Sequence, residues 1–415
     1  MNSDRGIAVI GAGIIGVNIG LRLVKEGYKV TLIDRTTPGK GCSFGNAGLL
    51  ARSSIYPLSD IKTLVGIPSM ILDPSGPLSI KLSYLLRFVP WMLRFLAVGL
   101  FGDKEKLAKG LSLLTDSSVE LYSQLVEEAG QPELIKKSDY LQVYRHRSNF
   151  YKSASEISLR RKFGSQIEEI GRAEILELEP ALSADYKYGF RIYDHGFTID
   201  PEALLLAIFK LFQTYGGIFQ KGCVSQLNNE PKGKLTIICE KDEFEFDQVI
   251  VAAGAYSAKL LKSINVNIPL DTERGYHITI PNSGCSLHRP VMEGEKKFLA
   301  TPMRMGLRFA GTVEFAGLES PPTMKRFDIM TKNAKKMLPD LNFNESSTWM
   351  GCRPTLPDSL PVIGEIKDKP NIFCAFGHQH VGLTSAPKTG KLITDLLSGR
   401  NPNDDISCYS VERFF

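Results

Sequence analysis

Cysteine is scarce in this chain of 415 residues, and none of its seven cysteines stands in a C-x-x-C pair. An odd number of widely spaced cysteines argues against a disulfide framework and against a zinc site. The chain also has no long run of Lys or Arg, and its 50 basic and 45 acidic residues leave a net charge of only +5. The N-terminus lacks the apolar region of a signal peptide. We therefore expect a cytoplasmic protein that does not bind nucleic acid.

The first motif lies near the N-terminus, in IAVIGAGIIG (7–16). Four apolar residues predict a buried parallel strand, and Gly11, Gly13 and Gly16 complete a G-x-G-x-x-G turn before a helix. A second strand ends at Asp34, about 20 residues beyond the turn. Together these features predict a dinucleotide-binding unit, in which the helix N-terminus receives the pyrophosphate and Asp34 accepts hydrogen bonds from a ribose.

This unit does not by itself separate FAD from NAD. The next segment, 35–54, is rich in Gly, Ser, Thr and Asn, where an NAD-binding fold would usually continue into another helix. The small residues between Cys42 and Leu49 would let the backbone pass close to a flavin ring, and a mobile surface loop is the other interpretation.

The most apolar stretch is 78–101, which is interrupted by Arg87, Pro90 and Arg94. A central arginine costs roughly 2.5–3.5 kcal/mol in a spanning helix, so we do not expect a transmembrane segment. One interpretation is a helix that docks at a membrane interface, because the two arginines share a helical face. The interpretation we favour is a helix pair that is covered within a second domain.

Later segments indicate how the rest of the chain is organised. A buried helix is expected to begin at Pro201 with Asp200 as its N-cap, and the apolar run 246–254 predicts another strand of the nucleotide-binding sheet. Residues 274–316 alternate between apolar and polar around a short turn, which predicts an antiparallel sheet in an inserted second domain. The closing segment, 351–399, predicts a proline-rich loop, a strand, a glycine turn and a helix from about Ala386.

Three motifs in this order resemble those of the D-amino acid oxidase/dehydrogenase superfamily of FAD enzymes: GAGIIG…LID, DQVIVAAGAYS and RPTLPDSLPVIG…AFGHQHVGLTSAPKTG. Within it the chain is most similar to bacterial D-amino acid dehydrogenases, including those that act on D-hydroxyproline, and next to glycine oxidase. The resemblance implies an α/β fold class. A Rossmann-type FAD-binding domain (1–80, 195–258 and 350–415) would be interleaved with an α+β substrate-binding domain built on an antiparallel sheet (81–194 and 259–349).

The resemblance also implies where FAD would lie, without a covalent link, since Gly351 occupies the position of the linking cysteine of sarcosine-oxidase relatives. The ADP half is expected around Ile14, Ile15, Asp34 and Arg35, with Val224 at the adenine. The remaining expected contacts with pyrophosphate and flavin are Gly11, Gly13, Gly16, Cys42, Ser43, Asn46, Ala47, Gly48, Leu49, Ala253 and Gly254. The isoalloxazine is expected against Gly377, His378, Val381, Gly382, Leu383 and Thr384.

For the substrate, Arg353 matches the arginine that grips the substrate carboxylate in this family. Tyr276 lies in a strand that supplies a second donor in some members, and His380 stands where the backbone can meet the substrate amine. The implied reaction is hydride transfer from Cα to flavin N5, which gives the imino acid in amino-acid catabolism. We expect a substrate of the D-proline, D-hydroxyproline or D-alanine type. A glycine- or sarcosine-type amine oxidase and a flavoprotein subunit of an electron-transfer complex are the alternatives.

Several residues have a second interpretation from the sequence. Arg353 could form a structural ion pair with Asp358, and Tyr276 could simply pack within its strand. Glu314 could line the pocket, but we expect it to pair with Arg308. The histidines show no recognisable spacing of metal ligands, so we expect no metal. Oxygen and a membrane quinone are both open as electron acceptors, as is the oligomeric state. The stretch 78–101 could bring the protein to the inner face of the cell membrane.

Overall fold

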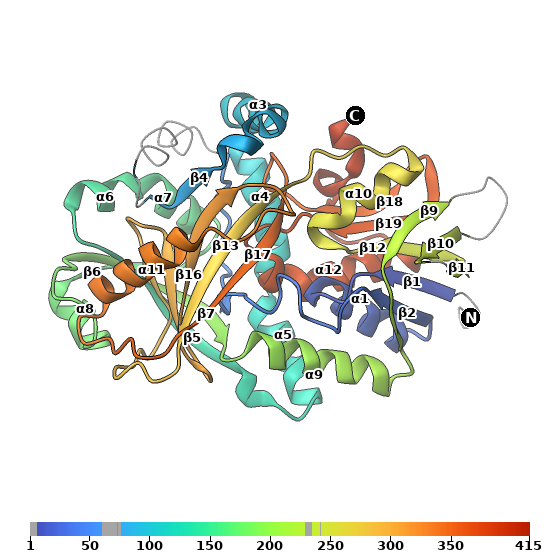
Figure 1. Cartoon of the computed structure of the whole chain (residues 1–415). Helices are drawn as coiled ribbons and strands as arrows, with labels where there is room; N and C mark the ends of the chain where they lie inside the picture. Colours follow the sequence, from blue (N-terminus) through green and yellow to red (C-terminus); the bar gives the residue numbers. More distant parts are fainter. Residues whose placement is uncertain (1–5, 60–72, 74–75, 229–234, 241) are drawn as a thin grey trace.

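The computed structural model describes residues 6–59, 73, 76–228, 235–240 and 242–415 (Figure 1). Parts of two predicted domain ranges, 1–80 and 195–258, lie outside these residues. The described chain forms a mixed α/β fold with two large sheets, as the sequence predicts.

A six-stranded sheet carries the predicted nucleotide-binding unit. Its order is β18-β19-β12-β1-β2-β8, and all neighbours are parallel except β18, which is antiparallel to β19. The strands are β1 (Gly6–Ile10), β2 (Lys29–Asp34), β8 (Ile218–Lys221), β12 (Gln248–Val251), β18 (Val362–Ile366) and β19 (Lys369–Phe376). The prediction that the chain returns to this sheet after Asp200 is confirmed, because β8 pairs with β2 and β12 pairs with β1.

Both faces of this sheet are covered, since alternate residues of β1 belong to two separate apolar clusters. One face packs against α1 (Ile14–Lys25), α4 (Lys104–Thr115), α5 (Ser118–Glu128), α9 (Pro201–Thr214) and α12 (Gly382–Leu397). The other lies under β9 (Val224–Asn228), β10 (Leu235–Cys239), β11 (Asp242–Phe246) and α10 (Ser257–Leu261). The cap predicted for α9 is present, because the Asp200 carboxylate accepts the Ala203 N–H at 3.0 Å.

A ten-stranded, mostly antiparallel sheet forms the second half. Its strands are β3 (Leu49–Leu50), β4 (Leu78–Ile80), β5 (Ile135–Tyr144), β6 (Ile167–Gly171), β7 (Tyr188–Thr198), β13 (Asp271–Ile280), β14 (Val291–Glu293), β15 (Phe298–Met303), β16 (Gly306–Phe315) and β17 (Ser347–Thr355). The helices α6 (Arg147–Lys152), α7 (Ala154–Lys162), α8 (Arg172–Leu178) and α11 (Met324–Met337) accompany it (Figure 1). The strands β3 and β4, and parts of β7 and β17, come from ranges that the predicted division assigned to the FAD-binding domain. Arg353 therefore lies on a strand of this sheet and not in a proline-rich loop.

The apolar stretch 78–101 folds into β4, a short 3-10 turn (Leu82–Tyr84) and α3 (Leu85–Phe101), which projects at the top of Figure 1. Three aromatic residues of α3 are buried beside Phe315, but its opposite face is exposed. The interpretation as a covered helix pair is therefore wrong. Within the described residues, Leu82–Phe101 is long and apolar enough to cross a membrane, by length and composition alone.

Candidate active site

A cavity of about 1270 Å³ is lined by residues from both sheets and from α3. Most of the residues that the sequence singles out line it: Gly11, Gly13, Ile14, Ile15, Asp34, Arg35, Cys42, Ser43, Asn46, Ala47, Leu49, Val224, Ala253, Gly254, Tyr276, Arg353, His378, His380, Val381, Gly382, Leu383 and Thr384. The exceptions are Gly16, Gly48 and Gly377. The fold therefore gathers residues from four distant parts of the chain around one cavity.

The first glycine turn is shaped by close backbone packing. Gly11 has φ +113°, and a Cβ there would lie 2.3 Å from the carbonyl oxygen of Ala252. A Cβ at Gly16 would lie 1.8 Å from the carbonyl oxygen of Gly11, so Gly16 is required behind the turn although it does not line the cavity. Gly13 is open, with only the Ser43 hydroxyl near its missing Cβ. The N-terminus of α1 therefore faces the cavity, where it favours an anionic group such as a pyrophosphate.

Asp34 ends β2 at the rim of this turn. One carboxylate oxygen accepts the Ala12 N–H at 2.8 Å, and the other accepts the N–H and hydroxyl of Thr36. The oxygen that accepts from Ala12 keeps lone-pair capacity for a further donor, as a ribose hydroxyl would require. Beside it, the Arg35 guanidinium lies 3.9 Å from the ring centroid of Tyr256, at the same end of the cavity as Val224.

The segment 35–54 is held in place at several points and lines the cavity, which favours its interpretation as a backbone that passes close to the cofactor over that of a mobile loop. Arg308 donates to the carbonyl of Asn46 at 2.8 Å, and Thr301 donates to the carbonyl of Ala47 at 2.8 Å. The Cys42 thiol donates to the carbonyl of Cys352 at 2.7 Å, and burial raises the pKa of Cys42 to about 12. Cys42 is therefore a neutral thiol that joins the loop to β17 and not a nucleophile.

The second glycine turn leads into α12, which begins at Gly382, four residues before the predicted start. Its first turn lines the cavity. His378 is buried, its Nε2 lies 3.1 Å from the Thr389 hydroxyl, and burial lowers the pKa of His378 to about 3. A neutral, hydrogen-bonded His378 therefore orders the turn.

Arg353 reaches the cavity from β17 and sits directly opposite Glu273 of β13 in the antiparallel register. Its Nη1 donates to the Thr312 carbonyl at 3.3 Å, and it forms no ion pair within the part of the chain that the structure describes. Burial lowers the pKa of Arg353, and Glu273 opposes that effect. Arg353 is thus a partly buried cation that still has free donors beside the cavity.

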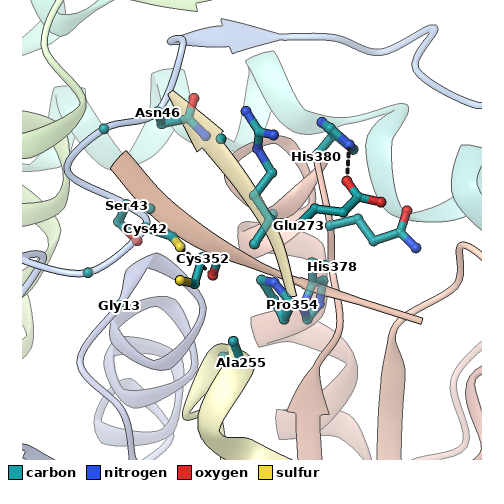
Figure 2. Close-up of a pocket in the computed structure, with 18 of the residues that line it drawn as sticks. Gly13, Cys42, Ser43, Asn46, Ala255, Glu273, Cys352, Pro354, His378 and His380 are labelled. Carbon is teal, nitrogen blue, oxygen red and sulfur yellow. Dashed lines mark hydrogen bonds and ion pairs between the residues drawn. The ribbon is translucent and has the colours of Figure 1, made fainter. Parts of the chain in front are cut away.

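Glu273 is buried and both of its oxygens are engaged. Its Oε2 lies 2.7 Å from Nε2 of His380 (Figure 2). Its Oε1 accepts from the Thr355 hydroxyl at 3.1 Å. Burial raises the pKa of Glu273, but His380, Arg353 and Thr355 together outweigh burial and hold that pKa below its usual value. The ionised carboxylate is directed at His380, which keeps it from closing an ion pair with Arg353.

Gly275 makes room for the Arg353 guanidinium. A Cβ at this position would lie 2.2 Å from both Cζ and Nη2 of Arg353 and 2.5 Å from its Nη1. The guanidinium therefore lies flat against the bare backbone of β13. Further along the same face, His277 and Trp349 stack with their ring centroids 5.2 Å apart.

Tyr276 lies on the opposite face of β13, because side chains alternate along a strand. Its hydroxyl donates to the Glu314 carboxylate and accepts the Thr323 N–H at 3.1 Å, and its ring packs on Phe327 of α11. The resemblance implied that this hydroxyl would be a second donor to the substrate beside Arg353. The structure instead turns it toward Glu314.

The ion pair expected between Glu314 and Arg308 needs correction, and the alternative pairing of Arg353 with Asp358 is not formed. Glu314 lies 3.4 Å from Arg274 and not beside Arg308, which instead binds carbonyl groups of the cavity loop. Asp358 pairs with Arg413 at 2.6 Å, so it does not neutralise Arg353.

Sequence reasoning missed Glu273, Gly275 and Trp349 as cavity residues. Their role depends on pairing between strands that are far apart in sequence, for which a single sequence carries no signal.

A mostly parallel sheet with an open glycine turn, joined to a cationic pocket on a second sheet, is typical of a nucleotide-dependent enzyme. Residues 6–396 match the family described as DAO, FAD dependent oxidoreductase. The chain belongs to this family and is an FAD-dependent oxidoreductase. The cavity fits that cofactor, because Gly13 leaves the first glycine turn open and the α1 N-terminus faces the cavity there.

Individual relatives resemble the chain over its full length. It is 35% identical to a D-amino-acid oxidase of Bradyrhizobium diazoefficiens, with 100% of both chains covered. It is 29% identical to a D-amino acid dehydrogenase of Vibrio atlanticus, with 98% of this chain and 99% of the relative covered. Among solved structures, glycine oxidase from Geobacillus kaustophilus has a TM-score of 0.74 at 20% identity and 98% coverage of each chain. L-proline dehydrogenase from P. horikoshii has a TM-score of 0.76 at 20% identity, with 100% of this chain and 98% of that chain covered. The structural likeness supports the fold.

Proposed function

We propose that this enzyme oxidises a small D- or cyclic α-amino acid to its imino acid and binds the substrate through its carboxylate at Arg353. The observation that carries the proposal is the free guanidinium of Arg353, which faces the cavity without an ion-pair partner among the described residues. A partly buried cation without a counter-ion is unfavourable, and a substrate carboxylate would supply the missing charge. The names of the curated relatives support the same substrate class.

The roles of the protein's residues follow from their placement. Arg353 can present two parallel N–H donors, which would fix both the distance and the direction of a carboxylate. Phe88, Trp91 and Trp349 add apolar walls that exclude water from the cavity. When bound, FAD supplies the acceptor for a hydride. A substrate that binds with a neutral amine needs no strong protein base.

Glu273 and His380 complete the pocket beside Arg353. The side chain of His380 is 37% exposed, so the Glu273–His380 pair lies at the boundary between buried pocket and solvent. By engaging Glu273, the His380 and Thr355 side chains leave Arg353 free for the substrate. We assign His380 and Thr355 as positioning residues for this reason.

The proposal is tested by anaerobic bleaching of the flavin absorption in the purified holoenzyme. The substrate panel is D-proline, D-hydroxyproline, D-alanine, glycine, sarcosine and L-proline. We expect bleaching by D-proline, D-hydroxyproline or D-alanine, while bleaching by glycine or sarcosine alone would indicate an amine oxidase of that type. Arg353→Ala should keep FAD but lose bleaching, and normal turnover in this variant would refute the assignment.

Reoxidation is tested separately, because oxygen and a membrane quinone are both candidate acceptors. Oxygen uptake and the reduction of a soluble quinone analogue can be compared on the same preparation after reduction by the best amino acid. The faster reaction identifies the acceptor class.

A further inference from the structure

The outer face of α3 is apolar along its whole length. Leu86, Pro90, Leu93, Ala97 and Leu100 recur at the helical spacing that places them on one side, and all five are exposed. We call these five residues the outer stripe. The exposed fractions of Leu86, Leu93 and Leu100 are 87%, 58% and 57%. In the most apolar 18 residues of the segment Leu82–Phe101, only 11% of the residues are buried. Such a continuous apolar stripe on a surface marks a contact with something outside the molecule.

The surroundings of the outer stripe are cationic. Lys81, Arg87 and Arg94 are exposed, and none of them forms an ion pair with a residue that the structure describes. The sequence from 76 to 102 contains no Asp or Glu. An apolar stripe flanked by unpaired cations matches the surface of a bilayer that contains anionic lipids.

The inner face of α3 fixes how the helix can approach a bilayer. Phe88, Trp91 and Phe95 are buried, and the rings of Phe88 and Trp91 lie 4.2 Å and 5.4 Å from that of Phe315 in β16, centroid to centroid. A helix held on one side by the protein core cannot be surrounded by lipid. It can only lie in the plane of the membrane surface, with the outer stripe turned toward the acyl chains.

We propose that α3 docks this protein on the surface of an anionic bilayer, with the outer stripe inserted at the interface and Arg87 and Arg94 against lipid phosphates. A second copy of the chain is the less suitable occupant. Pairing of two outer stripes would bring the same arginines together with no acidic residue of the helix to offset them.

The position of α3 connects this surface to the cavity. Phe88, Trp91, Met92 and Phe95 on its inner face line the cavity wall, so docking brings that wall to the membrane. A quinone dissolved in the bilayer would then be the nearest electron acceptor. The inference about the quinone rests on the proposed function, whereas the inference that α3 docks on a bilayer does not.

Vesicle flotation of the holoenzyme tests the docking. The vesicles are phosphatidylcholine alone and phosphatidylcholine mixed with phosphatidylglycerol. We expect flotation with the mixed vesicles, weakened by high salt, and little with phosphatidylcholine. Leu86→Ser/Leu93→Ser should abolish flotation, and Arg87→Gln/Arg94→Gln should weaken it by about fivefold per cation. The matched control is Leu206→Ser on α9, at the opposite side of the molecule in Figure 1, where Leu206 is 42% exposed.

Other outcomes would overturn the proposal. These are a wild-type protein that does not float, a Leu86→Ser/Leu93→Ser variant that floats as the wild type does, or a dimer that this variant dissociates while vesicles remain unbound. Thermal unfolding and flavin absorption should be unchanged in the variant, as should bleaching by the best amino acid. If bleaching fails in the wild type while flotation persists, the proposed function is refuted and the docking stands.

Discussion

The replacement of Gly275 by alanine should weaken substrate binding indirectly, by displacing the Arg353 guanidinium. The added Cβ would lie 2.2 Å from Cζ and Nη2 of Arg353, whereas ordinary contact begins near 3.4 Å. The backbone cannot yield easily, because β13 pairs with β17 on one side and β16 on the other. The guanidinium must therefore move by about 1 Å or more, and a misplacement of this size in an active site can cost roughly 100-fold in rate.

The expected loss can be bounded from the interaction itself. Truncating one partner of a buried charge pair costs about 2–5 kcal/mol, which is roughly 30-fold to several thousand-fold. A displaced guanidinium retains part of this energy, so we expect kcat/KM to fall by about 100-fold. FAD should remain bound, because Gly275 is separate from both glycine turns.

The assay is steady-state turnover with the best amino acid, together with the flavin absorption of each purified variant. Gly6→Ala is the matched control, since a Cβ at this strand glycine would meet its nearest atom at an ordinary 3.7 Å. In the double variant, Gly275→Ala should lower kcat/KM little beyond the loss caused by Arg353→Ala, because both substitutions disrupt the same contact. Wild-type kcat/KM in Gly275→Ala, or a full additional loss in the double variant, would refute the reasoning.

Three further predictions concern the pocket, the cofactor and acid stability. His380→Ala should release Glu273 to pair with Arg353 and raise KM about tenfold. The double variant His380→Ala/Glu273→Gln should restore KM. An unchanged KM in His380→Ala would contradict this. Gly16→Ala should yield protein with little bound flavin, since its Cβ would lie 1.8 Å from the Gly11 carbonyl oxygen, and a normal flavin-to-protein absorbance ratio would count against the cradle. Burial lowers the pKa of three histidines, to about 4 for His195 and about 3 for His277 and His378. Below about pH 6.5 the unfolded chain therefore binds more protons than the folded chain. The free energy of unfolding should then fall with decreasing pH by up to ~4 kcal/mol per pH unit. Equal urea midpoints at about pH 7 and about pH 5 would contradict the expected acid loss.

The sequence alone predicted the elements that depend on local spacing. The strand, glycine turn and helix at the N-terminus follow from apolar runs and from backbone positions that only glycine can occupy, such as Gly11 at φ +113°. The cap at Asp200 is equally local, because its partner lies three residues away. These features involve neighbours along the chain, so their physical causes are visible in the printed sequence.

The tertiary structure decided which side chains meet. Arg353 faces Glu273 and lies over Gly275 because β17 pairs with β13 in one register, and the same pleat turns Tyr276 to the other side of the sheet. The exposed side of α3 is likewise set by which of its residues pack on Phe315. Composition measures how apolar a segment is, but burial depends on partners that long-range folding brings together.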